Sequence, residues 1–297
     1  MHDSFNVEIA GINFAVRCVA AKIPQVSDPA YTAFIKTERD PSALNVDIAL
    51  EFGSFPDMVR ATKIFDSGQS WSMFFDGVYY FLSLNPPAFD SPVWMARFDQ
   101  GLEGITVYCS EALKEGEKGS TVSNPVCYPL DQLLLMYVLA RNGGAILHAA
   151  GINHNNRGYV FPGRSGAGKS TLLRQFAQRT GVELLSDDRI VVRRTDHSFK
   201  GFGTPWPGEA GIARNESVPL SGIFFISHGS DNRIREIGRK EALERLLPVT
   251  SIPWYDRAVM TDILAFCDDL SFHVPSYELC FRPDGEVVHV LEEFASK

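Results

Sequence analysis

The chain has 297 residues, of which 45% are hydrophobic and 22% are charged. These fractions are those of an ordinary globular protein and exclude a largely disordered or low-complexity chain. The formal net charge of −8 argues against a general attraction to nucleic acid or to a membrane surface, so we expect neither as a partner.

Five cysteines are spread along the chain without any C-x-x-C pair, which is typical of free thiols in a reducing compartment. The first residues lack a basic stretch followed by an apolar one. No run approaches the roughly 18 apolar residues that a membrane-spanning helix needs. We therefore expect a soluble, cytoplasmic protein.

Residues 1–125 read as a β-rich N-terminal domain of unknown role. Apolar and polar residues alternate over 46–52, and two aromatic runs within 71–84 flank the dipeptide Asp76-Gly77. Period-two alternation predicts strands, and a turn dipeptide between two such runs predicts a hairpin. Residues 111–124 are rich in Gly, Ser, Lys and Glu and predict a linker, so we place a second domain at 126–297.

The second domain mixes helices and strands. Residues 132–141 predict a helix that is apolar on nearly all sides and therefore buried. Residues 145–152 and 158–161 predict a strand pair that leads into a glycine-rich loop. The other expected elements are a helix ending at Gly181, strands at 182–185, 190–193 and 222–227, helices at 239–247 and 255–268, and closing strands at 276–282 and 287–291.

The loop is Gly163-Arg164-Ser165-Gly166-Ala167-Gly168-Lys169-Ser170, a full match to the phosphate-binding pattern G-x-x-x-x-G-K-[ST]. In such a loop the glycines let successive backbone N–H groups surround an anion. The lysine charge reaches the terminal phosphates, and the serine hydroxyl takes a place on Mg²⁺. Together with the following Thr171, residues 163–170 therefore predict a site for the phosphates of a nucleotide.

Asp187 and Asp188 follow a predicted strand, 18 and 19 residues after Lys169. A helix and a tight turn fill that spacing, so we expect their strand to run beside the one that enters the loop, with both carboxylates at the phosphates. One carboxylate can hold Mg²⁺ through water, and the other can accept the proton of a hydroxyl nucleophile. Adjacent aspartates after a strand are otherwise a turn or a helix cap.

His148 lies in a strand that is otherwise made of small or apolar residues. A lone histidine in such a strand is more often a core residue than a reacting one. Because this strand is expected to pair with the one that enters the loop, His148 can orient an acceptor or share a proton with Asp188.

The order His148-Ala149-Ala150-Gly151, then the loop, then Leu185-Ser186-Asp187-Asp188-Arg189 resembles the catalytic domain of HPr kinase/phosphorylase and HPr-kinase-like proteins. The resemblance covers residues 129 to about 195. It implies an α/β fold related to phosphoenolpyruvate carboxykinase, with a mixed sheet and a P-loop kinase domain, preceded here by the β-rich domain. It also implies ATP or pyrophosphate as donor, Mg²⁺ as metal, catalytic roles for His148, Lys169 and Asp188, and metal binding at Ser170 and Asp187.

The chain also differs from that family. Thr171 stands where the enzymes usually have Glu, and their glycine-rich signature with a further metal-binding glutamate is not recognisable. Glu209 is our candidate for that glutamate, with a plain surface turn as the alternative, and Arg214 and Arg257 are candidates for transition-state charge. Residues 1–125 do not match the family's N-terminal domain, which argues against HPr itself as the acceptor.

Three functions fit these patterns. The first is an ATP-dependent, Mg²⁺-assisted kinase that phosphorylates a Ser or Thr hydroxyl of a protein or peptide, with Asp188 as general base. The second is a P-loop ATPase or switch, which the absence of an L-S-G-G-Q signature disfavours. The third is a nucleotide-binding protein without catalysis. We favour the first, and the resemblance implies a homo-oligomer as well.

Overall fold

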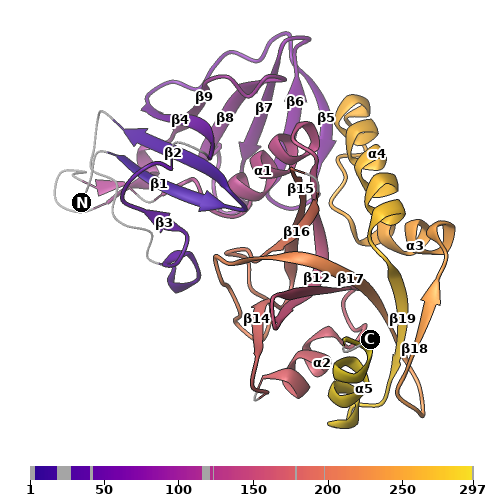
Figure 1. Ribbon diagram of the computed structural model, residues 1–297. Helices are drawn as coiled ribbons and strands as arrows, with labels where there is room; N and C mark the ends of the chain where they lie inside the picture. Colours follow the sequence, from indigo (N-terminus) through magenta and orange to yellow (C-terminus); the bar gives the residue numbers. More distant parts are fainter. Residues whose placement is uncertain are drawn as a thin grey trace. The chain divides into compact units, whose positions relative to one another are not determined.

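The computed structural model describes residues 4–18, 28–40, 43–115, 121–122, 124–177, 179–196 and 198–295. The chain forms two compact units, Met1–Leu135 and Met136–Lys297 (Figure 1). The division falls inside helix α1 (Leu130–Arg141). The predicted linker at 111–124 lies partly outside the described residues, so the boundary that we placed there stays a prediction.

A nine-stranded mixed sheet forms the first unit, in the order β3-β1-β2-β4-β9-β8-β7-β6-β5. β2 pairs in parallel with β4, β4 pairs in parallel with β9, and the other neighbours are antiparallel. The strands are β1 (Ser4–Ile9), β2 (Ile12–Cys18), β3 (Ile35–Lys36), β4 (Leu44–Phe52), β5 (Thr62–Asp66), β6 (Trp71–Phe75), β7 (Tyr79–Leu84), β8 (Trp94–Asp99) and β9 (Ile105–Cys109). A short pair, β10 (Lys114–Glu115) and β11 (Thr121–Val122), and the 3₁₀ helices η1 (Pro29–Tyr31) and η2 (Glu111–Leu113) complete its elements.

The alternation in the sequence decides which side chains of this sheet are buried. In β4, Val46, Ile48 and Leu50 are buried, and the residues between them are more exposed. The predicted hairpin is confirmed, since β6 and β7 pair antiparallel. Asp76 Oδ1 stabilises its turn by accepting hydrogen bonds of 2.8 and 2.7 Å from two backbone N–H groups.

The second unit contains an eight-stranded mixed sheet, so the chain is a mixed α/β protein with two large mixed sheets. Its main path is β13-β12-β15-β16-β17-β19-β18, and β14 pairs with β12. A parallel pairing of β17 with β13 links the path back to its start. The strands are β12 (Gly144–His154), β13 (Arg157–Pro162), β14 (Val182–Ser186), β15 (Arg189–Thr195), β16 (Ser198–Phe202), β17 (Ser217–His228), β18 (Arg233–Ile237) and β19 (Ser276–Phe281).

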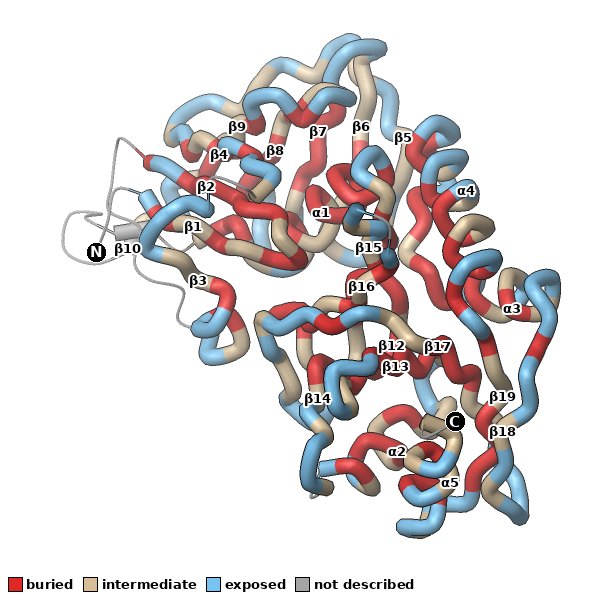
Figure 2. Tube along the Cα trace, viewed as in Figure 1, coloured by how far each residue is buried: buried red, intermediate tan, exposed pale blue. Residues whose placement is uncertain are grey.

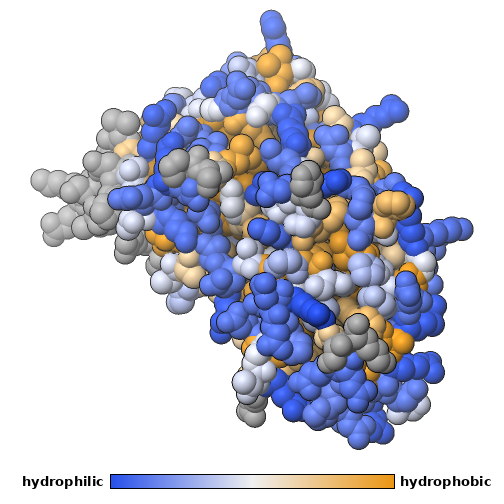
Figure 3. All heavy atoms as spheres, viewed as in Figure 1, coloured by the Kyte–Doolittle hydropathy of each residue, from blue (hydrophilic) through white to orange (hydrophobic). Residues whose placement is uncertain are grey.

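Helices α2 (Lys169–Phe176) and α5 (Glu286–Ala295) bury their apolar faces against this sheet. Figure 2 shows β12 and β13 buried over most of their length, and on the face drawn in Figure 3 hydrophilic side chains cover the region of α2 and α5. The unit's other helices are α3 (Arg239–Leu246), the 3₁₀ helix η4 (Leu247–Val249) and α4 (Arg257–His273). The core beneath α2 and α5 contains Phe161, Leu172, Phe176, Phe224 and Val288.

Several predicted elements need correction. Residues 287–291 are not a strand but part of α5, because Val287, Val288 and Leu291 form one buried helical face. β14 pairs with β12, so it lies one strand away from β13 rather than beside it. β16 and β18 were not predicted. α2 ends at Phe176, short of Gly181, and α4 extends to His273.

The five cysteines are free, and four of them are buried. Among the described residues, no helix combines the length and the apolar content that crossing a bilayer requires.

Candidate functional site

The antiparallel pair β12 and β13 places His148 beside the start of the loop. Asn155 and Asn156 turn the chain between the two strands with positive φ angles of 51° and 63°, as a tight two-residue hairpin requires. After β13 ends, the N–H of Gly163 donates a 3.0 Å hydrogen bond to the carbonyl of His148. The histidine and the loop therefore share one edge of the sheet.

Two glycines shape the loop before α2 begins. Gly166 and Gly168 have φ angles of 82° and 98°, a region that side chains with a Cβ rarely adopt. The N–H of Ala167 closes a turn onto the carbonyl of Arg164 at 3.1 Å. Gly168 then caps α2, whose first N–H groups have no intrahelical acceptor. The partial positive charge at the N-terminus of α2 therefore favours an anion in front of the loop.

Lys169, the first residue of α2, folds its side chain back into the loop. It is only 7% exposed, and its Nζ donates to the carbonyls of Gly163 at 2.7 Å and Arg164 at 3.3 Å. The third neighbour of Nζ is Nε2 of His148 at 2.9 Å. Burial lowers the pKa of Lys169, and the nearby Asp188 carboxylate counteracts part of that effect.

Each carboxylate oxygen of Asp188 has a side-chain partner. Its Oδ1 lies 3.0 Å from Nε2 of His148, and its Oδ2 lies 2.7 Å from Nη1 of Arg189. Burial raises the pKa of Asp188, but the hydrogen bond from His148 and the charges of Arg189, His148 and Lys169 lower it by more. Asp188 is therefore an ionised carboxylate at neutral pH.

His148 Nε2 has two competing neighbours. If Nε2 carries a proton, it donates to Asp188, and if it carries a lone pair, it accepts from Lys169. One ring nitrogen cannot do both at the same time. The tautomer of His148 therefore decides whether its Nε2 bonds to Asp188 or to Lys169.

Asp187 has quite different partners. It is 2% exposed, and its carboxylate accepts hydrogen bonds from the backbone N–H groups of Gly208 at 2.9 Å, Ala210 at 2.7 Å and Ile212 at 3.3 Å. A Cβ at position 208 would lie 2.9 Å from Oδ2 of Asp187, so only glycine approaches this closely. Asp187 thus ties the 208–212 loop, which carries Glu209, to the end of β14.

These groups surround one cavity of about 390 Å³. The predicted catalytic, metal-binding and loop residues line it, except Gly163 and Arg164, whose carbonyls accept hydrogen bonds from Lys169. Arg214 and Arg257 do not line it. Arg174, which was not predicted for the site, also lines the cavity and donates from Nε to the carbonyl of Ser170 at 3.3 Å. Arg174 follows Ser170 by four residues in the helix, and this spacing places both on the same helical face.

The cavity offers hard oxygen donors for a divalent ion. Its lining includes a hydroxyl and three carboxylates, those of Ser170, Asp187, Asp188 and Glu209. Within the described part of the chain, no three His, Cys, Asp or Glu residues are grouped closely enough to hold a metal by themselves. This donor set fits Mg²⁺, which commonly takes one or two protein ligands and completes its shell with water and phosphate.

Comparison of the chain with protein-family models gives no match, and neither does comparison with curated proteins. Solved structures do match, and one of them is the Hpr(Ser) kinase/phosphatase from Coxiella burnetii. It is 13% identical and aligns over 51% of this chain and 93% of its own, with a TM-score of 0.29. A distant structural neighbour of the chain is thus a kinase/phosphatase.

Proposed function

We propose that the protein is an ATP-dependent kinase that transfers the γ-phosphoryl group to a Ser or Thr hydroxyl of a protein or peptide. The observation that carries the proposal is the environment of Asp188. Its carboxylate lines the same cavity as the glycine-rich loop, it has a lowered pKa, and it lies 3.0 Å from Nε2 of His148. An ionised, oriented carboxylate beside a phosphate site is what a general base for a hydroxyl nucleophile requires.

In this proposal, residues 163–171 bind the phosphates of ATP. The unpaired N–H groups at the start of α2 provide donors, and the helix dipole favours the anion. Lys169 gives up its contacts with the carbonyls of Gly163 and Arg164 and takes phosphate oxygens in their place. The same change frees Nε2 of His148 to donate to Asp188.

Mg²⁺, when bound, neutralises charge on the phosphates. Ser170 and Glu209 are the residues that would hold it directly, because both line the cavity with oxygen atoms. Asp187 contributes by fixing the loop that carries Glu209, and the one acceptor position that its carboxylate has left would help to hold the metal through water.

The transfer step follows from these positions. The acceptor oxygen forms a bond to the γ-phosphorus while the bond from that phosphorus to the β,γ-bridging oxygen breaks, and ADP leaves. The proton of the acceptor hydroxyl passes to the carboxylate of Asp188. His148 orients that carboxylate through Oδ1, and Arg189 does so through Oδ2.

The test is transfer of label from [γ-³²P]ATP, with Mg²⁺, to a library of Ser- and Thr-containing peptides. We expect Asp188→Asn to lower the transfer rate by at least about 100-fold, since general base catalysis contributes roughly that much or more. Asp196→Asn, in the exposed turn after β15, is the matched control and should retain full transfer. Equal transfer by Asp188→Asn would exclude it as the base, and acceptor-independent hydrolysis would favour an ATPase.

A second measurement tests the phosphate site alone. Lys169→Met keeps the length and burial of the side chain but removes the charge, so we expect ATP affinity to fall by about tenfold or more. Lys240→Met, on the exposed side of α3, removes the same charge and should bind ATP normally. Calorimetric titration with ATP and Mg²⁺ measures both, and unchanged binding by Lys169→Met would contradict the assignment.

A further inference from the structure

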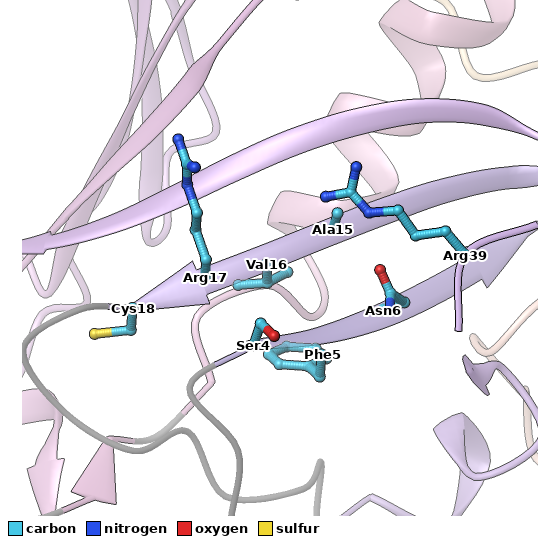
Figure 4. A pocket seen from close by; sticks show the side chains of 8 residues that line it. All are labelled: Ser4, Phe5, Asn6, Ala15, Val16, Arg17, Cys18 and Arg39. Atoms are coloured by element: carbon cyan, nitrogen blue, oxygen red, sulfur yellow. The ribbon is translucent and has the colours of Figure 1, made fainter. Parts of the chain in front are cut away.

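A second cavity lies in the first unit, on the hairpin of β1 and β2, and the proposed kinase site does not use it. Its volume is about 540 Å³. Arg17 comes from β2, Asn6 from β1 and Arg39 from the segment after β3. Figure 4 shows both guanidinium groups on the same face of the hairpin as the small side chain of Ala15.

The strand register explains why these side chains meet. β1 and β2 are antiparallel, with Ser4 opposite Arg17 and Asn6 opposite Ala15. Residues with these spacings point to one face of a sheet, and the apolar residues between them point to the other face, where they are buried. The cavity therefore results from regular strand pairing. The small side chain of Ala15 leaves space at its base.

The charge of this cavity is opposite to that of the chain. The side chain of Arg17 forms no hydrogen bond or ion pair with the described residues, and Arg39 uses Nη2 for one contact of 2.6 Å with Oδ1 of Asp47. Among the described residues, no carboxylate lines the cavity. The side chain of Arg17 is unpaired within the described chain, and Arg39 is paired only through Nη2, so in a chain of net charge −8 the cavity indicates a site for an anion.

The half-buried amide of Asn6 adds a neutral donor to the two arginines. Asn13 is 1% exposed, and its Nδ2 donates to Oδ1 of Asn6 at 3.3 Å and to Oδ1 of Asn45 at 2.9 Å. This contact occupies the Asn6 oxygen and leaves its Nδ2 as a donor with no protein partner in the described chain. The cavity thus presents hydrogen-bond donors of two kinds, which suits carboxylate oxygens.

We propose that this cavity binds an acidic segment of a peptide, with glutamate or aspartate side chains on Arg17 and Arg39. Its volume is in the range of sites that enclose several chemical groups rather than one carboxylate. A long nucleic acid would extend beyond the two arginines onto an acidic protein, which favours a peptide. The proposal concerns the first unit, needs no nucleotide and stands apart from the proposed kinase activity.

The test is fluorescence anisotropy of the full chain with two dye-labelled peptides, Gly-Glu-Gly-Glu-Gly-Glu-Gly and its Gln counterpart, at low salt and without ATP. We expect the Glu peptide to bind at least about tenfold more tightly, and Arg17→Gln to weaken its binding about tenfold. Arg60→Gln, which removes an exposed arginine of the same unit outside this cavity, should change binding less than twofold.

A steric variant separates the cavity from general charge. Ala15→Leu keeps both arginines and fills the space at the base of the cavity, so it should abolish binding of the Glu peptide while circular dichroism stays unchanged. Equal binding of the two peptides, or full binding by Arg17→Gln, would overturn the proposal. Tighter binding of a labelled oligonucleotide with the same dependence on Arg17 would overturn it as well. Label transfer from ATP is measured separately, so a negative result with the Glu peptide would not affect the test of the proposed kinase activity.

Discussion

Asp187 and Asp188 are adjacent in the chain, but their carboxylates have different partners. Among the described residues, Asp187 accepts hydrogen bonds only from backbone N–H groups, all in the 208–212 loop. Asp188 contacts the side chains of His148 and Arg189. The first carboxylate therefore fixes the position of a loop, while the second is held as a charge at the edge of the cavity.

Asp187→Asn should loosen the 208–212 loop. Asparagine has one acceptor oxygen, and its NH₂ group would face N–H donors that the carboxylate now binds. We expect a loss of about 1–3 kcal/mol in the free energy of unfolding, since buried donors lose charge-assisted partners. Chemical denaturation measures that loss, and hydrogen exchange of the loop localises it. If Asp188→Asn loosened the loop equally, the tether would not be specific to Asp187.

The lowered pKa of Asp188 predicts a defined pH dependence of stability. Because its folded pKa lies below the ordinary value of 3.8, the carboxylate stabilises the fold above that pH. This contribution is lost as the pH falls through the folded pKa. The unfolding free energy of the wild type minus that of Asp188→Asn should therefore be constant above about pH 5 and decrease below about pH 4.

Arg189→Gln provides the control for this pH dependence. It removes one of the charges that lower the pKa of Asp188. The difference in unfolding free energy between Arg189→Gln and the double variant Arg189→Gln/Asp188→Asn should therefore depend less on pH than the difference between the wild type and Asp188→Asn. Denaturant titrations of these four proteins at several pH values measure both differences. A difference that did not vary with pH would mean that the charges of His148, Lys169 and Arg189 do not act on Asp188.

At the scale of elements, three parallel strands bring their carboxyl ends together at the loop. β13 enters the loop, and β17, parallel to both β13 and β19, ends at His228. A Cβ at position 168 would lie 3.2 Å from Cε1 of His228 and 3.4 Å from Cε1 of Phe281. The loop is thus packed against the ends of the neighbouring strands, which limits residue 168 to glycine for a second reason besides its φ angle.

Gly168→Ala should therefore be more destabilising than Gly166→Ala. Both positions have positive φ, which is unfavourable for alanine by about 1–2 kcal/mol, but a Cβ at 166 meets open space. His228→Ala removes the closest neighbour and should narrow the gap between the two glycine variants. Chemical denaturation of the single and double variants measures this coupling. Equal losses for Gly166→Ala and Gly168→Ala would show that the loop is not packed at His228.

Local patterns in the sequence predicted the elements with strong periodicity or clear turns. The β6–β7 hairpin and α3 are confirmed by their pairing and bounds. The predicted strand at 287–291 was wrong because the apolar residues Val287, Val288 and Leu291 are compatible with a short strand as well as with one face of a helix. The hydrogen bond from the N–H of Glu286 to Oδ1 of Asp284 identifies the preceding residues as the start of a helix rather than as a hairpin turn.

The candidate site was predictable where it depended on a short motif. The residue types of 163–171 and their order are local, and so is the aspartate pair. The partners of Asp187 lie more than 20 residues along the chain, and they are backbone groups, which leave no residue-type signal. Arg189 sits next to Asp188 in the sequence, but only the side-chain geometry shows that the two form an ion pair.

At the scale of the whole molecule, each unit has its own cavity with its own chemistry. The cavity on the β1–β2 hairpin of the first unit is lined by two arginines and one amide, and the second unit's cavity combines a helix N-terminus, Lys169 and carboxylates. The two proposals therefore predict different ligands, an acidic peptide and a nucleotide, that bind to different parts of the same chain.

Hydrogen exchange of the full chain can test both ligands in one experiment. A ligand at 100 times its dissociation constant slows exchange through local opening by about 100-fold, because opening must then release it. With ATP and Mg²⁺ we expect protection at 163–172, 186–189 and 208–212, where the backbone surrounds the second unit's cavity. With the Glu peptide we expect it at 4–18 and 36–40. Protection of 163–172 by the peptide alone would instead assign both ligands to one site and remove the separate role of the first cavity.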